Sequence, residues 1–436
     1  MTRILIRGAT VLTMDDEMSI LPRACVAIEA ENIEAVGQEP AGKWDEVIEA
    51  DGRVALPGFV NAHTHAAMTL VRGYADDLEL QPWLQEKIWP MEAMLNREDV
   101  RWGTLLAIAE MLRGGVTTFN DMYYFYDAVA QAVEESGMRA CLSGVLLGFL
   151  PTAERDLEQA VEFANHWRGR ADGRVETMLG PHALYTVPEP LMKKVVEAAK
   201  RLGVGLHIHL SENKREVEDS LQQHGLTPVA HCERLGIFEA GPVLAAHCVH
   251  CDEKDIEILA RCGVGVSHNP GSNMKLANGA APVPEMLKAG VKVGLGTDGA
   301  ASNNNLDLLE EARLAALLHK LTHSDPTILP AEKVLFMATR GGAAALGLDD
   351  KIGQIKPGMK ADLILLDMNQ PHLTPLHHVT SQIVYSARAS DVRTVIVNGR
   401  ILLREGQLLT IDEEAVMKEC SRRANELARG ERPGRH

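Results

Sequence analysis

The chain lacks several features that would each indicate a particular class of protein. Of its 436 residues, 44 are Lys or Arg and 60 are Asp or Glu, which gives a formal net charge of −16 at pH 7. A basic tract for nucleic acid or anionic lipid is therefore not expected. No stretch approaches the roughly 20 apolar residues that a membrane span needs, so we expect no membrane partner either.

Two further absences concern the compartment. The N-terminal stretch MTRILIRGATVLTMDDEMS has neither an apolar segment nor a small-residue cleavage site, so we expect no signal peptide. The seven cysteines are an odd number scattered through apolar segments, which is not the pattern of a disulfide framework. Together these observations predict a cytoplasmic protein with buried thiols.

What the chain does contain is an alternation of short β-rich runs with amphipathic helical stretches. In the stretch 191–203, Leu191, Val195, Val196 and Ala199 share one helical face. Eight runs have the composition of strands: 57–65, 115–121, 139–148, 175–185, 204–212, 242–250, 264–270 and 292–299. Eight strand–helix repeats predict an α/β fold, a parallel (β/α)8 TIM barrel, with an open doubly wound sheet as the alternative.

The two ends of the chain have a different character. Segments within 3–56, 360–368 and 392–406 have the pattern of hairpin-forming strands, and VNGR at 397–400 places an Asn-Gly turn between apolar runs. We expect both ends to pair into one small β-sandwich. The predicted parts are residues 1–56 (first part of the sandwich), 57–355 (barrel) and 356–436 (second part of the sandwich with a terminal helix).

Polar residues end nearly every apolar run, at the C-terminal face where barrel enzymes carry their function. Core packing alone would not require imidazole and carboxylate groups at so many of these positions. They are His63, His65, Asp121, His182, His207, His209, Glu212, His247, His250, His268 and Asp298.

Some of these residues can form a metal site. Alternate residues of a strand point the same way, so His63 and His65 can face one ion. A histidine of HIHLSE (207–212) and Asp298 of GTDG would complete a set of neutral nitrogen and anionic oxygen donors. This mixture suits Zn²⁺, with Fe²⁺ or another transition metal as the alternative.

Five motifs carry a family resemblance: PGFVNAHTH (57–65), HIHLSE (207–212), AHCVH (246–250), SHNP.SN.KL (267–276) and LGTDGAASNNNLDLLEEARLA (295–315). On these motifs the chain resembles the amidohydrolase superfamily over nearly its whole length. Within it, the chain most resembles the 5-methylthioadenosine/S-adenosylhomocysteine deaminases. Triazine hydrolases and guanine deaminases share several of the motifs.

The resemblance implies a hydrolytic deaminase with one divalent metal ion per subunit, bound by His63, His65, His209 and Asp298. The family's His-x-x-Glu pattern selects His209 with Glu212, which leaves His207 as a neighbouring packed imidazole. Relatives with two metals carry a bridging modified Lys at the end of the fourth strand. This chain reads MLGPHALY there, which favours one metal.

Catalytic roles follow from the chemistry that the resemblance implies. A bound metal lowers the pKa of water toward neutrality. Glu212 would protonate a ring nitrogen, and Asp298 would accept the water proton and pass it to departing ammonia. His247 would stabilise the charge that develops during attack. The structural alternatives are a solvated carboxylate for Glu212 and a buried structural histidine for His247.

The family match also implies substrate-binding residues. Residues 78–95 would form a lid in which Glu92 accepts hydrogen bonds from ribose hydroxyls. His182 would contact the purine. Arg139 and Arg155 would lie near the carboxylate of a homocysteine tail, although Arg155 could equally be a surface helix charge.

Other residues and motifs give weaker evidence for a functional role. Trp83 and Trp89 of the lid either line the site or pack in the core. HCE (231–233) with CVHC (248–251) echoes another zinc deaminase architecture. However, His247 rather than Pro precedes Cys248, and HCE lies in ordinary helical sequence. We therefore predict no zinc site at these two motifs.

The resulting hypothesis is an enzyme that hydrolyses 5-methylthioadenosine and S-adenosylhomocysteine, with adenosine as a further candidate, to the inosine analogue and ammonia. Its partner would be a small-molecule nucleoside, and relatives imply a homo-oligomer. The alternatives are another amino- or chloro-heteroaromatic substrate, such as guanine or an s-triazine, and an inactive barrel used as a scaffold. The complete ligand set, together with Glu212 and His247, argues against the scaffold.

Overall fold

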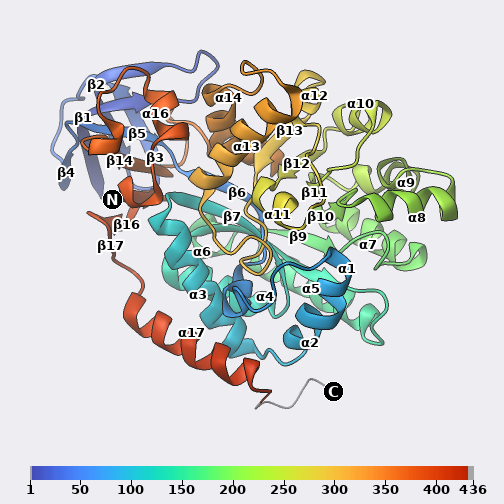
Figure 1. Cartoon of the computed structure of the whole chain (residues 1–436). Coiled ribbons are helices and arrows are strands. Elements are labelled where there is room, and N and C mark those ends of the chain that lie inside the picture. The colour runs from blue at the N-terminus through green and yellow to red at the C-terminus, as the bar shows by residue number, and fades with distance from the viewer. Residues whose placement is uncertain (1, 431–436) are drawn as a thin grey trace.

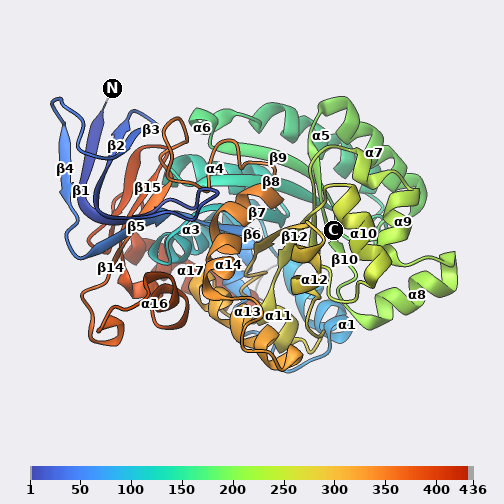
Figure 2. The ribbon, with the colours of Figure 1, turned by 90° about the horizontal axis from the view of Figure 1, so that it is seen from above.

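The computed structural model describes residues 2–430 and consists of an α/β barrel beside a separate sheet (Figures 1 and 2). Eight parallel strands follow one another in sequence order: β6 (Phe59–Thr64), β7 (Val116–Tyr123), β8 (Arg139–Leu146), β9 (Val175–Pro181), β10 (Gly205–Leu210), β11 (Val243–His247), β12 (Gly265–His268) and β13 (Lys292–Leu295). Just beyond β13, the amide of Asp298 donates to the carbonyl of His63 at 3.0 Å and brings the last strand to the first. The predicted (β/α)8 barrel is therefore confirmed.

Helices cover the outside of the strands. They are α3 (Arg97–Arg113), α4 (Tyr126–Ser136), α5 (Ala153–Trp167), α6 (Arg170–Gly173), α7 (Glu189–Leu202), α8 (Lys214–His224), α9 (Pro228–Arg234), α10 (Glu253–Arg261), α11 (Pro270–Lys275), α12 (Val283–Lys288), α13 (Leu308–His323), α14 (Ala331–Phe336) and α15 (Gly342–Ala345). Helix α7 follows the predicted stretch closely: it buries Leu191, Val195 and Val196, ends at Leu202 and is capped by Gly203, whose φ of 64° suits a C-cap glycine.

Burial on both faces explains why the barrel strands appear as continuous apolar runs in the sequence. Every residue of β7 and β10 is buried, because one face of each strand fills the barrel interior and the other lies under helices. A polar side chain in such a strand must find a partner inside the protein. Each histidine of β6 and β10 must therefore have a polar partner inside the protein.

Both ends of the chain build one nine-stranded sheet. Its strands are β1 (Arg3–Leu12), β2 (Ile20–Glu29), β3 (Asn32–Gly37), β4 (Glu46–Glu49), β5 (Arg53–Pro57), β14 (Leu363–Asp367), β15 (Val392–Val397), β16 (Arg400–Arg404) and β17 (Gln407–Leu408). Strand β5 lies between β1 and β14 and thereby joins the two ends. The predicted Asn-Gly hairpin is present between β15 and β16, with positive φ at Asn398 (51°) and Gly399 (73°).

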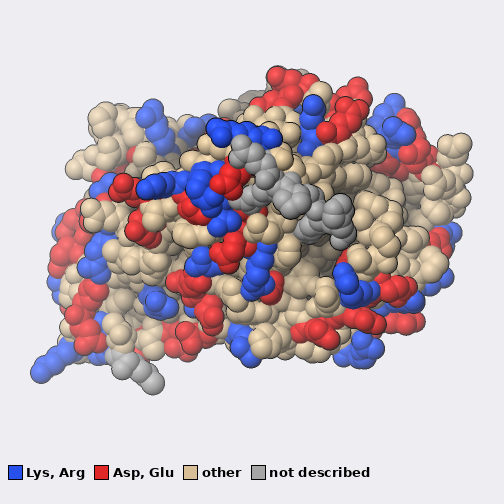
Figure 3. Space-filling view, turned by 90° about the horizontal axis from the view of Figure 1, so that it is seen from below, with Lys and Arg blue, Asp and Glu red and all other residues tan. Residues whose placement is uncertain are grey.

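Two C-terminal helices flank these units, α16 (Val379–Tyr385) and α17 (Glu413–Ala428). The predicted terminal helix is α17, which runs along the barrel (Figure 1) and places Arg423 Nη1 2.8 Å from Asp99 Oδ1 at the start of α3. Across the face in Figure 3, acidic and basic side chains lie interspersed. None of the helices within residues 2–430 combines the length and the apolar character needed to cross a bilayer.

The connection from β6 to α3 carries four short segments: η1 (Ala66–Val71), α1 (Leu80–Pro82), η2 (Trp83–Ile88) and α2 (Trp89–Glu92). The last three occupy the predicted lid. Pro82 and Pro90 lie in this segment, and η2 is a single π-helical stretch rather than a regular α-helix. The lid therefore consists of short turns, which place Trp83, Trp89 and Glu92 close together in sequence and space.

Candidate active site

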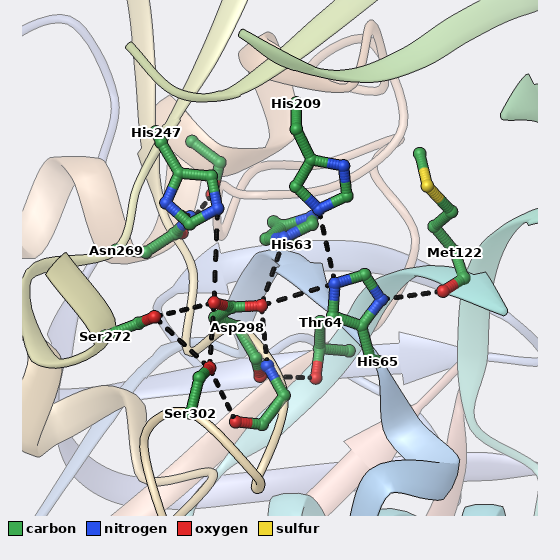
Figure 4. A network of polar contacts seen from close by, with 12 residues as sticks. His63, Thr64, His65, Met122, His209, His247, Asn269, Ser272, Asp298 and Ser302 are labelled. Atoms are coloured by element: carbon green, nitrogen blue, oxygen red, sulfur yellow. Dashed lines mark hydrogen bonds and ion pairs between the residues drawn. The ribbon is translucent and has the colours of Figure 1, made fainter. Parts of the chain in front are cut away.

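Side chains from the ends of four strands converge on one point inside the barrel mouth (Figure 4). His63 comes from β6 and His65 directly follows that strand; His209 comes from β10, His247 from β11, and Asp298 from the turn after β13. The donor atoms of His63, His65 and His209 all lie within 4.8 Å of one another, as do those of His63, His247 and Asp298. Strand order brings these residues together because C-terminal ends of parallel strands meet at one face.

Hydrogen bonds to backbone carbonyls fix the tautomers of two of these histidines. His65 Nδ1 lies 2.7 Å from Met122 O, and His209 Nδ1 lies 2.9 Å from His182 O. A carbonyl only accepts, so each Nδ1 carries the proton and each Nε2 presents a lone pair. These two Nε2 atoms are 3.3 Å apart. Two lone pairs at that distance repel one another unless a cation lies between them.

The remaining donors complete the same pattern. His63 Nε2 is buried and has no hydrogen-bond partner among residues 2–430. It lies 3.3 Å from Asp298 Oδ1, and His65 Nε2 lies at the same distance from that oxygen. Burial alone would raise the pKa of Asp298, but the surrounding imidazoles hold it well below its usual range. Three neutral nitrogens and a carboxylate oxygen are the donor set of a divalent transition metal, so the residues present fit such an ion.

A second layer of contacts holds the donors in place. His63 Nδ1 lies 2.8 Å from His207 Nε2, and His207 Nδ1 lies 3.2 Å from Ser143 Oγ. His207 is fully buried, which agrees with the packed imidazole expected from the family pattern. Asp298 Oδ2 accepts from Ser272 Oγ at 2.7 Å and Ser302 Oγ at 2.9 Å. Such partners orient metal ligands.

Glu212 and His247 lie beside the donor cluster. Glu212 is buried and accepts a hydrogen bond from Asn278 Nδ2 at 3.0 Å. Burial raises the pKa of Glu212 and so favours its protonated form. His247 Nε2 is 4.0 Å from both Glu212 and Asp298, and its Nδ1 is 2.8 Å from Asn273 Oδ1. Burial disfavours the imidazolium, but the two carboxylates outweigh it and raise the pKa of His247.

These residues line a pocket together with lid and loop side chains. Glu92 is buried in its wall and faces Tyr123, whose pKa is raised by burial and by the Glu92 charge. His182 lines the pocket as well; its Nδ1 lies 3.0 Å from Thr186 Oγ1, and burial lowers its pKa to about 3. Trp83 and Trp89 also line the pocket. The neutral His182 can therefore offer a hydrogen bond or stacking surface but no charge.

Arg139 lies elsewhere, and its predicted contact with the substrate is wrong. It is the first residue of β8, so it belongs to the N-terminal end of the strand, opposite the pocket. Its guanidinium is buried and binds Asp362 through two nitrogens, Nε at 2.6 Å and Nη2 at 3.1 Å, with Asn398 as a further acceptor. The hydrogen-bonding groups of Arg139 are therefore engaged by Asp362 and Asn398, which belong to the C-terminal part of the chain.

Arg155 lies in the first turn of α5, with an exposed side chain, and is not among the residues that line the pocket. This position fits the surface-charge alternative. Within residues 2–430, neither HCE (231–233) nor CVHC (248–251) forms a metal cluster with its own cysteines. His231 pairs with Glu189 at 3.0 Å, and Cys232, Cys248 and Cys251 are free thiols.

Three other polar strand-end residues serve the scaffold. Asp121 accepts the Ala66 amide at 2.6 Å, and burial raises its pKa to about 7. His250 Nε2 lies 2.8 Å from Asn278 O, and His268 Nε2 lies 3.3 Å from His319 Nε2. A polar residue at a strand end therefore does not by itself identify a ligand.

Several residues of the site escaped sequence reasoning. Asn273 and Ser272 lie within the SHNP.SN.KL motif, which was a usable signal. Ser302 lies in the last motif, four residues after Asp298. Asn278 and Tyr123 carry no comparable signal, since one lies in a loop and the other appears as part of an apolar run.

Comparison with known proteins extends these observations. Residues 54–402 match the profile of the amidohydrolase family. The 5-methylthioadenosine/S-adenosylhomocysteine deaminase of Pelotomaculum thermopropionicum is 53% identical over 437 residues, which cover 99% of this chain and 100% of that protein. A zinc-bound adenosine deaminase from Xanthomonas campestris is 37% identical with a TM-score of 0.94, covering 98% and 99% of the two chains. A zinc-bound atrazine chlorohydrolase from Arthrobacter aurescens is 27% identical with a TM-score of 0.90, covering 97% and 100%.

Proposed function

The chain belongs to the amidohydrolase family, and from that premise we propose that it hydrolyses 5-methylthioadenosine and S-adenosylhomocysteine to the inosine analogue and ammonia. The observation that carries the proposal is one pocket that combines a metal-donor cluster with a buried Glu212, whose pKa is raised by burial. The 53% identical relative with that substrate name supports the choice of nucleoside. At 27% identity, the chlorohydrolase supports the s-triazine alternative much less.

The proposed cofactor is one Zn²⁺ ion per subunit, bound by His63, His65, His209 and Asp298, with Fe²⁺ as the alternative. When bound, the ion supplies a water nucleophile at neutral pH. Zinc in two solved relatives and the absence of Lys among the pocket-lining residues of the described chain support a single zinc.

The protein's own groups would carry the protons. Glu212 donates its carboxyl proton to the ring nitrogen next to the amino-bearing carbon, which makes that carbon electrophilic. Asp298 receives the proton of the attacking water and passes it to the departing amino group. His247, held by Asn273, stabilises negative charge on the attacking oxygen.

Substrate binding is assigned to Glu92 and His182. Glu92 is an acceptor-only carboxylate in the pocket wall, which suits the two ribose hydroxyls of a nucleoside. His182 is neutral and lies in tilted contact with His209, with ring centroids 4.7 Å apart, so it borders the space next to the metal. The cytoplasmic location is supported by the seven free cysteines. Assembly into a homo-oligomer stays a prediction.

The test is a deamination assay on purified zinc-loaded protein with 5-methylthioadenosine. We expect a purine absorbance shift and stoichiometric ammonia, both abolished by a chelator and restored by Zn²⁺. Glu92→Ala should lower nucleoside kcat/KM by about 10²-fold or more, because a buried carboxylate contributes strongly to charge-assisted hydrogen bonds. It should spare turnover of an aminoheterocycle without ribose. A metal-loaded protein that releases no ammonia would contradict the proposal.

A further inference from the structure

The pocket lining contains carboxylates, histidines and apolar groups, but no Lys or Arg of the described residues. Its carboxylates are Glu92, Glu212 and Asp298, and no Lys or Arg of residues 2–430 lines it. Its apolar side chains are contributed chiefly by the lid and by the end of β8 with the loop that follows; they include Trp83, Leu84, Trp89, Val145 and Leu147. A ligand group that leaves the metal end of the pocket therefore meets an apolar wall.

The place of a 5′ substituent follows from the proposed function, on which this inference rests. Trp89 and Glu92 are three residues apart in α2, so their side chains lie on one side of the helix. The Trp89 ring packs against Phe149 at a centroid distance of 5.5 Å, and Phe149 follows Leu147 in the loop after β8. A ribose bound at Glu92 would therefore direct its 5′ substituent toward Trp89, Leu147 and Phe149.

The cations that a homocysteine tail would need are not at this wall. Arg139 is engaged with Asp362 at the N-terminal end of β8, and Arg155 lies exposed on α5 outside the lining. The negative charge of Glu92 opposes the approach of a second carboxylate. A methylthio group, in contrast, removes apolar surface from water at Trp89 and Leu147 without any polar cost.

We propose that the wall formed by Trp83, Trp89, Leu147 and Phe149 selects nucleosides with a short, uncharged 5′ substituent. 5-Methylthioadenosine and 5′-deoxyadenosine are then preferred over S-adenosylhomocysteine, whose zwitterionic end must remain in water at the pocket mouth. Phe149 is 56% exposed and packs against the lining residue Trp89 without itself lining the pocket.

The first experiment measures kcat/KM of the zinc-loaded enzyme for these three nucleosides. We expect S-adenosylhomocysteine to be at least about tenfold poorer than the two others, a difference of 1.4 kcal/mol. Equal or higher efficiency with S-adenosylhomocysteine overturns the inference and leaves the proposed function intact. Deamination of none of the three overturns the proposed function, and the inference with it.

The second experiment adds a cation to the wall. In Phe149→Arg the new guanidinium can stack on Trp89, and the exposed position tolerates the change. The ratio of kcat/KM for S-adenosylhomocysteine to that for 5-methylthioadenosine should rise about tenfold. Leu321→Arg, 78% exposed on α13, adds the same charge outside the pocket and should leave the ratio unchanged.

An unchanged ratio in Phe149→Arg would show that the tail does not pass this wall, against the inference. Arg155→Ala tests whether the exposed arginine reaches the tail instead. We expect the ratio to stay as in the unmodified enzyme. A selective loss of S-adenosylhomocysteine turnover in Arg155→Ala would show that Arg155 binds the tail. That result would overturn the inference.

Discussion

Each histidine of the site has one ring nitrogen occupied by a neighbour. His65 and His209 face carbonyls, His63 faces His207, and His247 faces Asn273. The second nitrogen of each ring is thereby directed to the centre of the site before any ligand arrives. Because the side chains are already oriented, ligand binding requires a smaller loss of side-chain entropy.

At the residue scale, Glu212→Gln tests the proton donor. Gln has nearly the same shape and can accept the Asn278 hydrogen bond, but it has no carboxyl proton to donate. We expect kcat for 5-methylthioadenosine to fall about 10²- to 10⁴-fold, with KM and the thermal midpoint nearly unchanged. Steady-state kinetics and thermal unfolding check this.

The matched control is Glu218→Gln, six residues further on, whose side chain is 61% exposed on α8. It should leave both kcat and the thermal midpoint unchanged. Retention of wild-type kcat in Glu212→Gln would remove this residue from the proton pathway.

At the scale of elements, helix α13 fixes helix α11 and the loop after β13, which support Asp298 and His247. Glu311 of α13 accepts the amide of Gly271 and the side-chain amide of Asn303, both at 2.9 Å. Gly271 precedes Ser272 and Asn273, which contact Asp298 and His247 in turn. One buried carboxyl outside the pocket therefore connects the outer helix to the site.

The raised pKa of Glu311 leads us to expect that the stability of the protein depends on pH. Burial raises its pKa from 4.5 to about 8. The folded protein then binds this proton more tightly than the unfolded chain, so its contribution to the free energy of unfolding is full below pH 4.5 and is lost as the pH rises to about 8. Glu311→Gln does not titrate. The stability advantage of the unmodified protein over this variant should therefore shrink between pH 5 and pH 8.5.

Denaturant unfolding of both proteins at the two pH values measures this difference. Glu310→Gln is the control, since the neighbouring side chain is exposed and its difference from the unmodified protein should not change with pH. A Glu311→Gln difference that is constant with pH would show that Glu311 is already ionised in the folded protein at pH 5.

At the scale of the whole molecule, a buried ion pair joins the barrel to the chain-end sheet. Arg139 starts β8, and Asp362 precedes β14 and also accepts the Asn398 amide at 2.7 Å. Arg139→Ala would leave the Asp362 carboxylate buried without its cation. We expect a loss of about 3–5 kcal/mol in the free energy of unfolding, measured by denaturant unfolding.

The folded fraction of Arg139→Ala should keep its relative kcat/KM for S-adenosylhomocysteine and 5-methylthioadenosine, because the residue is remote from the pocket. The double variant Arg139→Ala/Asp362→Ala should recover part of the lost stability, since no unpaired buried charge remains. A selective loss of S-adenosylhomocysteine turnover would instead restore Arg139 to the substrate site.

The example of Arg139 shows where prediction from motifs reached its limit. The predicted strand began at this residue, so its place at the N-terminal end of β8 was available from the sequence. A family alignment gives a position along the chain but not the end of the strand from which the side chain acts. Its partner Asp362 lies 223 residues away, and no local pattern connects the two.

The sequence by itself determined the barrel, the hairpin at Asn398 and the candidate donors His63, His65, His209 and Asp298. Periodicity, turn chemistry and strand-end position are local properties, so they can be recognised from the amino-acid sequence alone. Only the tertiary structure decided that Asn278 bonds Glu212, that His207 supports His63 and that no Lys or Arg of residues 2–430 lines the pocket. These facts depend on how loops from distant strands approach one another, and that approach is determined by packing of the whole molecule rather than by any short segment.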